Sequence, residues 1–265
     1  MDGQLGLRFA ALAARGEKPL AMTTGLKTRD TFRLTSAFGG LPGALAAQGA
    51  VVRTRRGQSL ALAIDGSEAV FVVRVGALML RVTLPPGLRQ VVAILYPGDV
   101  FRAAFAPPAA SAHLSAVSSG EVLRFRWKAF ADLAASDPEI ARYYEDAVAR
   151  QTARQAIQMA AVGRFDCRQR VATFLVELAL RTGMRAPCGG LAFEMPLNRT
   201  DMADYLGLNA DTLSRTMSRL RASGLLSHPE RHRALVRDFE ALAALTPAAQ
   251  SLTALCGEAA LSKHG

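Results

Sequence analysis

The sequence predicts an α+β protein with an N-terminal antiparallel β-roll, one long helix in the middle and a group of short helices and strands at the end. Three observations predict this order. Short apolar runs separated by turn residues fill positions 41 to 130. An uninterrupted helical stretch then begins near Ser136, and two short capped amphipathic segments lie between positions 198 and 224. Half of the residues are hydrophobic, which is enough for a sizeable core.

The stretch Leu41–Phe130 is β-like. It holds several short runs of Val, Ile and Leu, such as those in "AVFVVRVGALMLRVTL". Turn residues separate the runs at Asp65-Gly66, Gly76, Pro85-Pro86-Gly87 and Pro97-Gly98-Asp99. Strands at such regular spacing predict a small sandwich or roll.

A long helix is predicted from Ser136 or Asp137, either of which can cap its first turn, through Val162. Pro138 suits the first turn, and the next helix-breaking residue is Gly163. One stripe recurs at alternating spacings of four and three residues and consists of Ile140, Tyr144, Ala147, Gln151, Arg154, Gln158 and Ala161. This is coiled-coil spacing, although its second half is polar. Two arrangements fit the pattern: the helix pairs with a second copy of itself through this stripe, which would make it the dimer interface, or it lies on its own domain.

The next segment predicts a helix followed by a short strand. In "DCRQRVATFLVELALRTG", Val171, Phe174, Leu175 and Leu178 fall on one face, and Gly183 is a natural C-cap. "LAFEMPL" is then a candidate strand.

Two short helices joined by a tight turn are predicted after that strand. The first covers Arg199–Leu206, with Asn198 as its N-cap and Gly207 as its stop. The second covers Ala210–Ala222, with Asn209 as its N-cap. A helix, a turn that contains glycine and a second capped helix together form a helix-turn-helix.

The second of these helices has an apolar inner face and a polar outer face. Leu213, Met217 and Leu220 recur on the inner face, so the outer face can enter a DNA major groove. Arg can donate two hydrogen bonds to guanine, Asp can accept one from cytosine, and Ser can contact several base edges or a phosphate. The predicted base-reading residues are Asp211, Ser214 and Arg215.

Other side chains are predicted to hold the DNA backbone, which positions the protein without reading sequence. After the second helix, "LLSHPERHRALVRD" predicts two strands joined by a basic turn, which is the arrangement of a wing. The predicted phosphate contacts are Asn198, Arg199, Asn209, Thr212, Ser218, Arg219, Arg221, Arg231 and Arg233. The competing interpretation is an ordinary charged helical pair that binds no DNA; the agreement of caps, turn, arginines and wing favours DNA binding.

The charge of the chain agrees with an anionic partner. A net charge of +10 and a pI of about 10.3 favour nucleic acid or a membrane surface. No apolar run is long enough to cross a bilayer and no signal peptide is evident, so we expect a cytoplasmic protein. Cys167, Cys188 and Cys256 are widely spaced, which indicates neither a zinc knuckle nor a disulfide framework.

Two other classes of function compete with a DNA-binding regulator. An enzyme on a cupin-like roll would need several histidines facing one cavity, and the roll holds only His113. We therefore expect no enzyme, no catalytic residue and no metal site. An adaptor whose winged helix binds protein would not need Ser214 and Arg215 at positions that face a groove.

The stretch "LNRTDMADYLGLNADTLSRTMSRLRASGLL" closely resembles the DNA-binding domain of the Crp–Fnr transcription regulators. "GRFDCRQRVATFLVELALR", "SDPEIARYYEDAVARQ" and "GLRQVVAILYPGDVF" are similar to the family's helix before the winged domain, its dimerising helix and the end of its cyclic-nucleotide-binding β-roll. The resemblance covers about Leu41 to Leu245. It implies a homodimer on double-stranded DNA, a palindrome with TTGA-like half-sites, and RNA polymerase as a partner. Ser214 and Arg215 match the Ser-Arg of the Fnr branch, whereas Asp211 stands in place of its Glu, which leaves the outer half-site base open.

The roll lacks the residues with which relatives bind cyclic AMP. Arg102-Ala103 stands in place of Gly-Glu, and "SAHLSAVS" has His113 and Ser115 but no Arg to hold the cyclic phosphate. The resemblance therefore implies a degenerate ligand pocket at Arg102 and His113. The first cysteine, Cys167, comes too late for an Fnr-type iron–sulfur cluster. We expect no cofactor; the alternative is a haem-based gas-sensing regulator with His113 as an axial ligand.

These features divide the chain into five parts. They are an N-terminal extension (1–35), a β-roll sensor-like domain (36–135), a dimerisation helix (136–162), a winged helix-turn-helix DNA-binding domain (163–245) and a C-terminal tail (246–265). The extension and the tail carry no functional prediction. Cys167 lies beside Arg168 and near Arg170, which favours an oxidisable thiol; an inert thiol near a helix start is the simpler interpretation.

Overall fold

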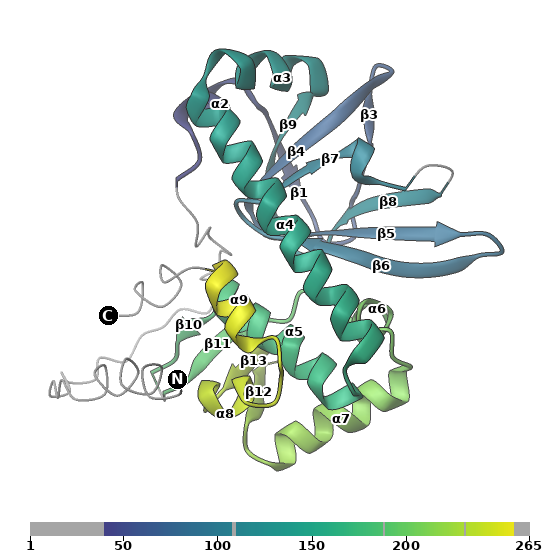
Figure 1. Ribbon diagram of the computed structural model, residues 1–265, viewed down its shortest axis with the longest axis vertical. Helices are drawn as coiled ribbons and strands as arrows, with labels where there is room; N and C mark the ends of the chain where they lie inside the picture. Colours follow the sequence, from purple (N-terminus) through teal and green to yellow (C-terminus); the bar gives the residue numbers. More distant parts are fainter. Residues whose placement is uncertain (1–39, 108–109, 188, 231, 257–265) are drawn as a thin grey trace, which may run out of the picture.

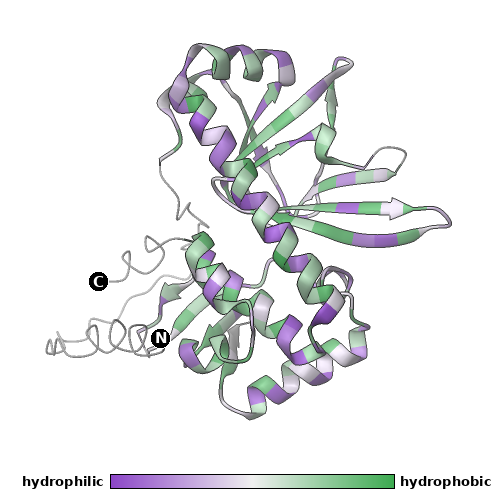
Figure 2. Ribbon diagram, viewed as in Figure 1, coloured by the Kyte–Doolittle hydropathy of each residue, from purple (hydrophilic) through white to green (hydrophobic). Residues whose placement is uncertain are grey.

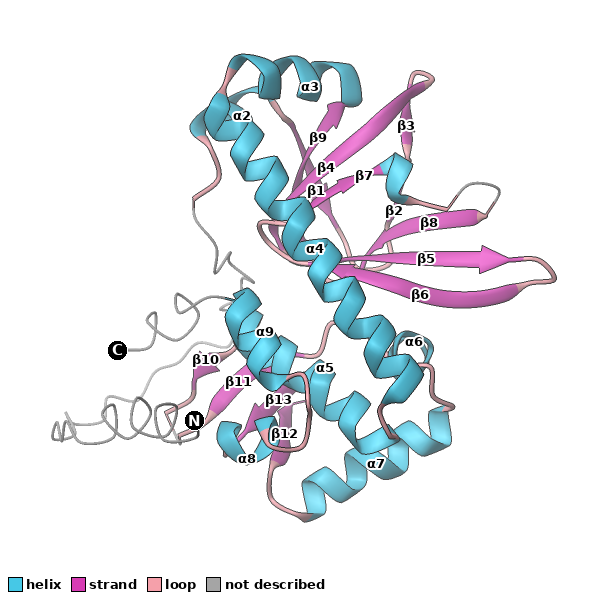
Figure 3. Ribbon diagram, viewed as in Figure 1, coloured by secondary structure: helices cyan, strands magenta, loops and turns pink. Residues whose placement is uncertain are grey.

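A computed structural model describes residues 40–107, 110–187, 189–230 and 232–256, and it joins a roll of strands to a smaller helical domain through one long helix (Figure 1, Figure 3). The predicted α+β class, with an antiparallel roll, a long helix and a winged helix-turn-helix, is confirmed. The predicted N-terminal extension lies outside the described residues. Within the described ranges, every helix is too short or too polar to span a membrane.

The roll consists of antiparallel sheets that share one core. One sheet has the strand order β1-β9-β4-β3, with β7 also paired to β4, and the other has the order β2-β8-β5-β6. The strands are β1 (Ala50–Thr54), β2 (Ser59–Leu60), β3 (Ala63–Ile64), β4 (Ser67–Val75), β5 (Leu78–Leu84), β6 (Leu88–Leu95), β7 (Val100–Arg102), β8 (Ser111–Ala116) and β9 (Gly120–Arg126), and a 3-10 turn, η1 (Ala103–Phe105), follows β7.

Alternate residues of these strands fill the interior of the roll, and the strands are mainly hydrophobic (Figure 2). Phe71, Leu80 and Leu114 come from three different strands and are almost fully buried in one cluster. Burying a side chain of this size contributes about 1.5–3 kcal/mol. The predicted turn at Gly76 connects β4 and β5. Its φ of +84° favours glycine, and a Cβ there would lie only 2.8 Å from the Ser119 carbonyl oxygen.

Both ends of the stretch predicted to be β-like are helical. Helix α2 (Gly43–Gln48) precedes β1 and buries Leu45, and helix α3 (Trp127–Ser136) follows β9 and buries Phe130. The β prediction was wrong here because these apolar residues cover the outer face of the β4 and β9 sheet instead of extending it. The Phe130 ring meets Phe125 of β9 edge-on, with ring centroids 5.5 Å apart.

The long helix, α4 (Pro138–Arg164), begins where the sequence predicts. The Asp137 carboxylate caps it by accepting a hydrogen bond from the Glu139 N–H at 2.9 Å, and Pro138 occupies the first turn. The helix continues through Gly163 to Arg164, where the Phe165 N–H closes the last turn on the Ala161 carbonyl at 3.0 Å.

The stripe predicted as a dimer interface packs against its own chain instead. Ile140 and Ala147 are fully buried in a cluster with the roll and α3, and Gln151 is buried as well. The Gln158 amide donates to the Tyr205 carbonyl at 2.6 Å. The buried Ile140, Ala147, Gln151 and Arg154 are therefore unavailable to a second chain, in contrast to the predicted dimer interface of Ile140, Tyr144, Ala147, Gln151, Arg154 and Gln158. Tyr144 and Gln158 are half-buried against the same chain. The other arrangement, a helix lying on its own domain, is the one observed.

The polar half of the stripe is buried because it pairs with charges on other elements. Arg154 Nη2 lies 2.8 Å from Asp99 Oδ2, and Arg181 Nη2 lies 3.1 Å from Asp99 Oδ1. The Tyr96 N–H donates to the same carboxylate at 2.8 Å, and Glu177 lies 3.5 Å from Arg154. Burial alone would raise the pKa of Asp99, but the two arginines outweigh it and lower that pKa. We call Asp99, Arg154, Glu177 and Arg181 the charge cluster; it links the roll, α4 and the next helix.

The helical domain is built around α5, whose residues 171–182 are all buried. A small antiparallel sheet in the order β10-β11-β13-β12 packs beside it. The predicted strand in "LAFEMPL" is β11, and the predicted C-cap, Gly183, ends α5. The elements are α5 (Cys167–Thr182), β10 (Met184–Arg185), β11 (Leu191–Glu194), α6 (Arg199–Leu206), α7 (Ala210–Ala222), β12 (Leu226–Glu230), β13 (Arg233–Val236), α8 (Phe239–Ala243) and α9 (Ala249–Cys256).

Helix α9 lies in the C-terminal tail (246–265), for which the sequence predicts no function. It packs against α5 and α4 and buries Leu252 and Cys256. Thr246, just before it, shares a hydrogen bond of 2.6 Å with Thr173 of α5. Burial raises the pKa of the Cys256 thiol to about 11. The described part of the tail is therefore part of the domain core.

Candidate nucleic-acid interface

The first helix of the helix-turn-helix, α6, has the predicted bounds and ends. The Asn198 side chain accepts a hydrogen bond from the Asp201 N–H at 2.9 Å, which caps the helix. Gly207 ends it with a φ of 61°, in the left-handed region that favours glycine. A methyl group at Gly207 would also lie 3.2 Å from Val162 Cγ1 at the end of α4. The backbone conformation of the turn favours glycine, and the close approach of Val162 adds to this preference.

Arg170 on α5 braces the same turn from the other side. Its Nη1 donates to the Gly207 carbonyl at 3.1 Å and to the Leu206 carbonyl at 3.3 Å, while its Nε donates to the Phe165 carbonyl at 2.9 Å. The sequence prediction treated Arg170 only as a neighbour of Cys167 and missed this role. The bonds to the turn join main-chain groups 36 and 37 positions away, so no local pattern could have indicated them.

The second helix, α7, also has the predicted bounds. The Asn209 side chain accepts from the Thr212 N–H at 2.7 Å. Leu213, Met217 and Leu220 are buried on the inner face as predicted. They fix α7 against α5, so its outer face has a defined direction.

The predicted base-reading residues lie together on the outer side of α7. Asp211 and Arg215 are exposed, and Ser214 is half-buried between them. The helix forms one edge of the molecule (Figure 1). Asp211 lies in the first turn, whereas Arg219 and Arg221 lie in the last, which is the favourable order for the helix dipole. The arrangement presents an acid at the N-terminal end of the helix and guanidinium groups along the rest.

The predicted phosphate contacts differ in their exposure and in their partners within the chain. Arg199, Ser218, Arg219 and Arg221 are exposed. Asn198 differs because both ends of its side chain are engaged: the oxygen caps α6, and the amide donates to Asp201 Oδ2 at 2.7 Å. The remaining candidates are Asn209, which is exposed and caps α7, Thr212 and Arg233, which are half-buried, and Arg231, which lies outside the described residues.

A hollow of about 470 Å³ lies between the start of α5 and the second half of α7. Arg168 and Arg219 line it, together with Asp166, Ser223 and the half-buried Cys167. Basic side chains therefore extend from α7 onto the start of α5, as a surface that follows a DNA backbone requires.

The two residues of the predicted degenerate ligand pocket are not brought together. Arg102 on β7 forms a bidentate pair with Glu68, at 2.9 and 3.0 Å, and its guanidinium stacks 3.7 Å above the Trp127 ring. Burial would raise the pKa of Glu68, but the bonds from Arg102 and the Ala104 N–H lower it. His113 lies on the other sheet, exposed, with its Nε2 3.1 Å from Ser111 Oγ.

Several known proteins similar to this chain are transcription regulators. Residues 169–245 match the family model described as the Crp-like helix-turn-helix domain. The nitrogen fixation regulation protein FixK of Azorhizobium caulinodans is 31% identical over 182 residues, which cover 66% of this chain and 71% of that protein. The transcriptional activator protein FnrL of Cereibacter sphaeroides is 28% identical, with 70% and 76% covered. The structure of FixK2 from Bradyrhizobium japonicum matches with a TM-score of 0.62 and 28% identity, covering 75% of this chain and 97% of that one.

Proposed function

Because the chain belongs to the Crp–Fnr family of DNA-binding transcription regulators, we propose that it binds a palindrome with TTGA-like half-sites as a homodimer. The outer face of α7 carries this proposal. Asp211, Ser214 and Arg215 project from a helix whose inner face is buried and whose N-terminus is capped. A recognition helix held in this way can enter a major groove with a fixed register.

Each residue of this face has a distinct role in the proposal. Arg215 donates two hydrogen bonds to the O6 and N7 atoms of a guanine, and Ser214 contacts a neighbouring base edge. Asp211 accepts from a cytosine amino group at the N-terminal end of the helix. Arg219 and Arg221, nearer the C-terminal end, bind backbone phosphates and position the helix without reading sequence.

Gel shifts on a TTGA-like palindrome and on a scrambled duplex, at graded salt, test whether Arg215 reads a base. Arg215→Ala should reduce the discrimination between the two duplexes about 5- to 150-fold, the range for one bidentate base contact. Arg237→Ala is the matched control, because it removes the same charge from an exposed position outside α7. If Arg215→Ala kept full discrimination, the assignment of Arg215 as a base reader would be wrong.

The homodimer requires a face of α4 other than the predicted stripe. Ala149, Thr152, Ala156, Met159 and Gly163 recur every three or four residues, and all are exposed. Met159 exposes 75% of its surface, and the neighbouring Val162 is exposed as well, so the apolar surface at this end of α4 extends beyond one side chain. Small residues with one methionine form a narrow seam against which a second α4 can pack closely.

Sedimentation equilibrium at micromolar concentration tests this seam. Ala156→Glu places two carboxylates opposite each other across the dimer and should shift the protein to monomers. Gln58→Glu adds the same charge on the exposed turn between β1 and β2 and should leave the dimer intact. A wild-type protein that was monomeric with and without DNA would exclude this dimer.

We further propose that the regulator acts without cyclic AMP, an iron–sulfur cluster or another cofactor, and that RNA polymerase is its partner at promoters. The bidentate Glu68 contact and the Trp127 ring already engage Arg102, so binding a cyclic phosphate there would first require that pair to open. The exposed His113 gives a haem-based sensor no support. Genome-wide footprinting of the purified protein with no added ligand should give discrete protected sites; sites that appeared only with cyclic AMP or haem would contradict the proposal.

A further inference from the structure

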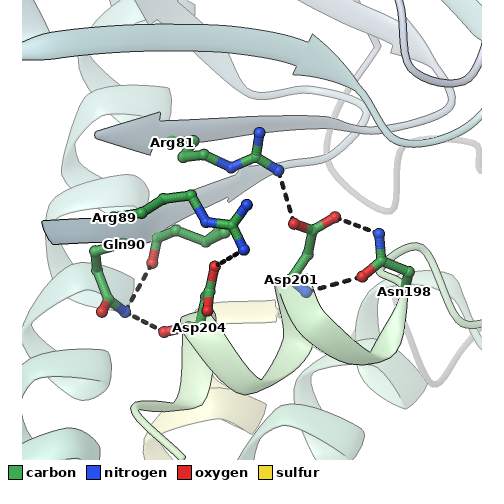
Figure 4. A network of polar contacts seen from close by, with 7 residues as sticks. Arg81, Arg89, Gln90, Asn198, Asp201 and Asp204 are labelled. Carbon is green, nitrogen blue, oxygen red and sulfur yellow. Dashed lines mark hydrogen bonds and ion pairs between the residues drawn. The ribbon is translucent and has the colours of Figure 1, made fainter. Parts of the chain in front are cut away.

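We propose that Arg81 and Arg89 of the β5–β6 hairpin are positioning residues for DNA recognition, because they clamp α6 of the helix-turn-helix to the roll. Arg81 Nη2 lies 2.7 Å from Asp201 Oδ1, and Arg89 Nη2 lies 2.7 Å from Asp204 Oδ2 (Figure 4). The Gln90 side-chain amide, on the same hairpin, donates to the Asp204 main-chain carbonyl. We call these contacts the hairpin clamp. Its link to DNA recognition rests on the palindromic binding proposed above.

The hairpin clamp reaches the N-terminus of α6. Asp201 accepts from Arg81 with one carboxylate oxygen and from the Asn198 amide with the other, and Asn198 in turn caps the helix (Figure 4). The side chain of Asp201 is only 11% exposed and that of Arg81 is 26% exposed. Charge-assisted hydrogen bonds that are partly shielded from water are stronger than ordinary surface ion pairs.

The clamped side of α6 and the reading side of α7 are separate. Asp201 and Asp204 are three positions apart and both contact the hairpin, so one side of α6 faces the roll. Asp211 and Arg215 of α7 remain exposed while the clamp is closed. The hairpin therefore holds the helix-turn-helix from the side of the roll and leaves the DNA-reading surface accessible.

A palindromic site requires two recognition helices at a fixed separation and orientation. A domain already held in one orientation loses less freedom when it binds than one that rotates on its linker. The hairpin clamp thus favours binding that uses both half-sites at once. Binding of one domain to a single half-site has no such requirement and does not depend on the clamp.

The sign of the effect separates the clamp from simple charge attraction. Asp201→Asn with Asp204→Asn removes two negative charges from a DNA-binding domain, and long-range electrostatics alone would tighten DNA binding. The clamp predicts the opposite. We expect the double variant to bind the full palindrome about tenfold more weakly, the loss expected from two partly exposed ion pairs, while half-site affinity does not fall.

Three further variants complete the binding experiment. Asp132→Asn with Glu139→Gln removes the same two charges at exposed positions on α3 and α4, and it should not weaken palindrome binding. Arg81→Asp should weaken palindrome binding, and adding Asp201→Arg should restore binding to the palindrome more than binding to a single half-site. The added positive charge alone would raise both affinities alike. Unchanged or tighter palindrome binding by Asp201→Asn with Asp204→Asn would overturn the proposal.

Hydrogen exchange of the free protein provides a readout that needs no DNA. The amides of β6 and α6 should exchange faster in Asp201→Asn with Asp204→Asn than in the wild type, while those of β4 in the roll core stay protected. Unchanged exchange in β6 and α6 would overturn the clamp even if the wild type binds the palindrome. If the wild type bound the palindrome no better than a scrambled duplex, the proposed DNA site would be refuted instead. The two experiments therefore distinguish a failure of the hairpin clamp from a failure of the proposed function.

Discussion

Asp99→Asn should lower the free energy of unfolding by about 3 kcal/mol, near the lower end of the range for breaking a buried ion pair. Asp99 is fully buried, and the side chains of Arg154 and Arg181 are 9% and 2% exposed, so the change leaves two guanidinium groups without their carboxylate in a site shielded from water. Two contacts limit the loss. Glu177 remains 3.5 Å from Arg154, and the Arg181 guanidinium lies 4.7 Å from the centre of the Tyr96 ring.

Chemical denaturation at neutral pH measures this loss. Circular dichroism follows the whole chain, and the single tryptophan, Trp127, follows the roll. Asp132→Asn is the matched control, because Asp132 pairs with Lys128 at 2.8 Å but both side chains are mostly exposed. It should cost no more than about 0.5 kcal/mol. Equal losses in Asp99→Asn and Asp132→Asn would refute the argument that burial sets the strength of the charge cluster.

The same carboxylate gives the fold a defined response to acid. The pKa of Asp99 is lowered on folding, so its stabilising contribution is fully present above the pKa of an unfolded aspartate, about 3.9. The contribution is lost as the pH falls from there through the folded pKa. Wild type should therefore lose stability below about pH 4 more steeply than Asp99→Asn. Parallel acid unfolding curves for the two proteins would contradict this.

Three further predictions concern α7 and the thiols. Arg219→Ala should weaken binding to specific and non-specific DNA alike, because it removes one phosphate contact. The slope of log affinity against log salt should fall by about one. A loss of affinity for the palindrome alone would contradict the assignment of Arg219 to a phosphate. Asn209→Ala should lower the free energy of unfolding by about 1 kcal/mol, measured by thermal unfolding. Asn209→Asp should keep most of this stability, because aspartate, like asparagine, can accept a hydrogen bond from the Thr212 N–H. In the folded protein at pH 8, iodoacetamide should modify the half-buried Cys167 before Cys256, because burial raises the pKa of the Cys256 thiol to about 11. Peptide mass spectrometry identifies the modified cysteine. Early modification of Cys256 would show that α9 opens readily.

The helix-turn-helix was the most predictable part of the molecule because its signals are local. Asn198 and Asn209 each accept from an N–H three positions along the chain, and Gly207 ends α6 in a conformation that few other residues adopt. Such signals are complete within a few residues. The bounds of α6 and α7 could therefore be read directly from the sequence, and so could the buried face of α7.

The contacts of α4 could not be read in the same way. A helix with a regular stripe shows that one face is special, but the pattern does not say whether that face meets its own chain or another one. Arg154 is buried because Asp99, 55 positions earlier, and Glu177 lie beside it. The hairpin clamp is equally non-local, since Arg81 and Asp201 are 120 positions apart. Only the folded chain brings these charges together.

The end of α4 and the turn between α6 and α7 approach each other closely at Val162 and Gly207. Most helix contacts absorb small shifts through rotamer changes on both sides, but glycine has no side chain to adjust. A single methyl group at position 207 would meet Val162 Cγ1 at 3.2 Å and Arg170 Nη1 at 3.4 Å. The Val162 side chain at the end of α4 therefore lies beside the turn before α7, with slightly less room than a methyl group at position 207 would need. A displacement of the end of α4 toward the turn would therefore press the Val162 side chain on the backbone of Gly207, two positions before the residue that caps the recognition helix.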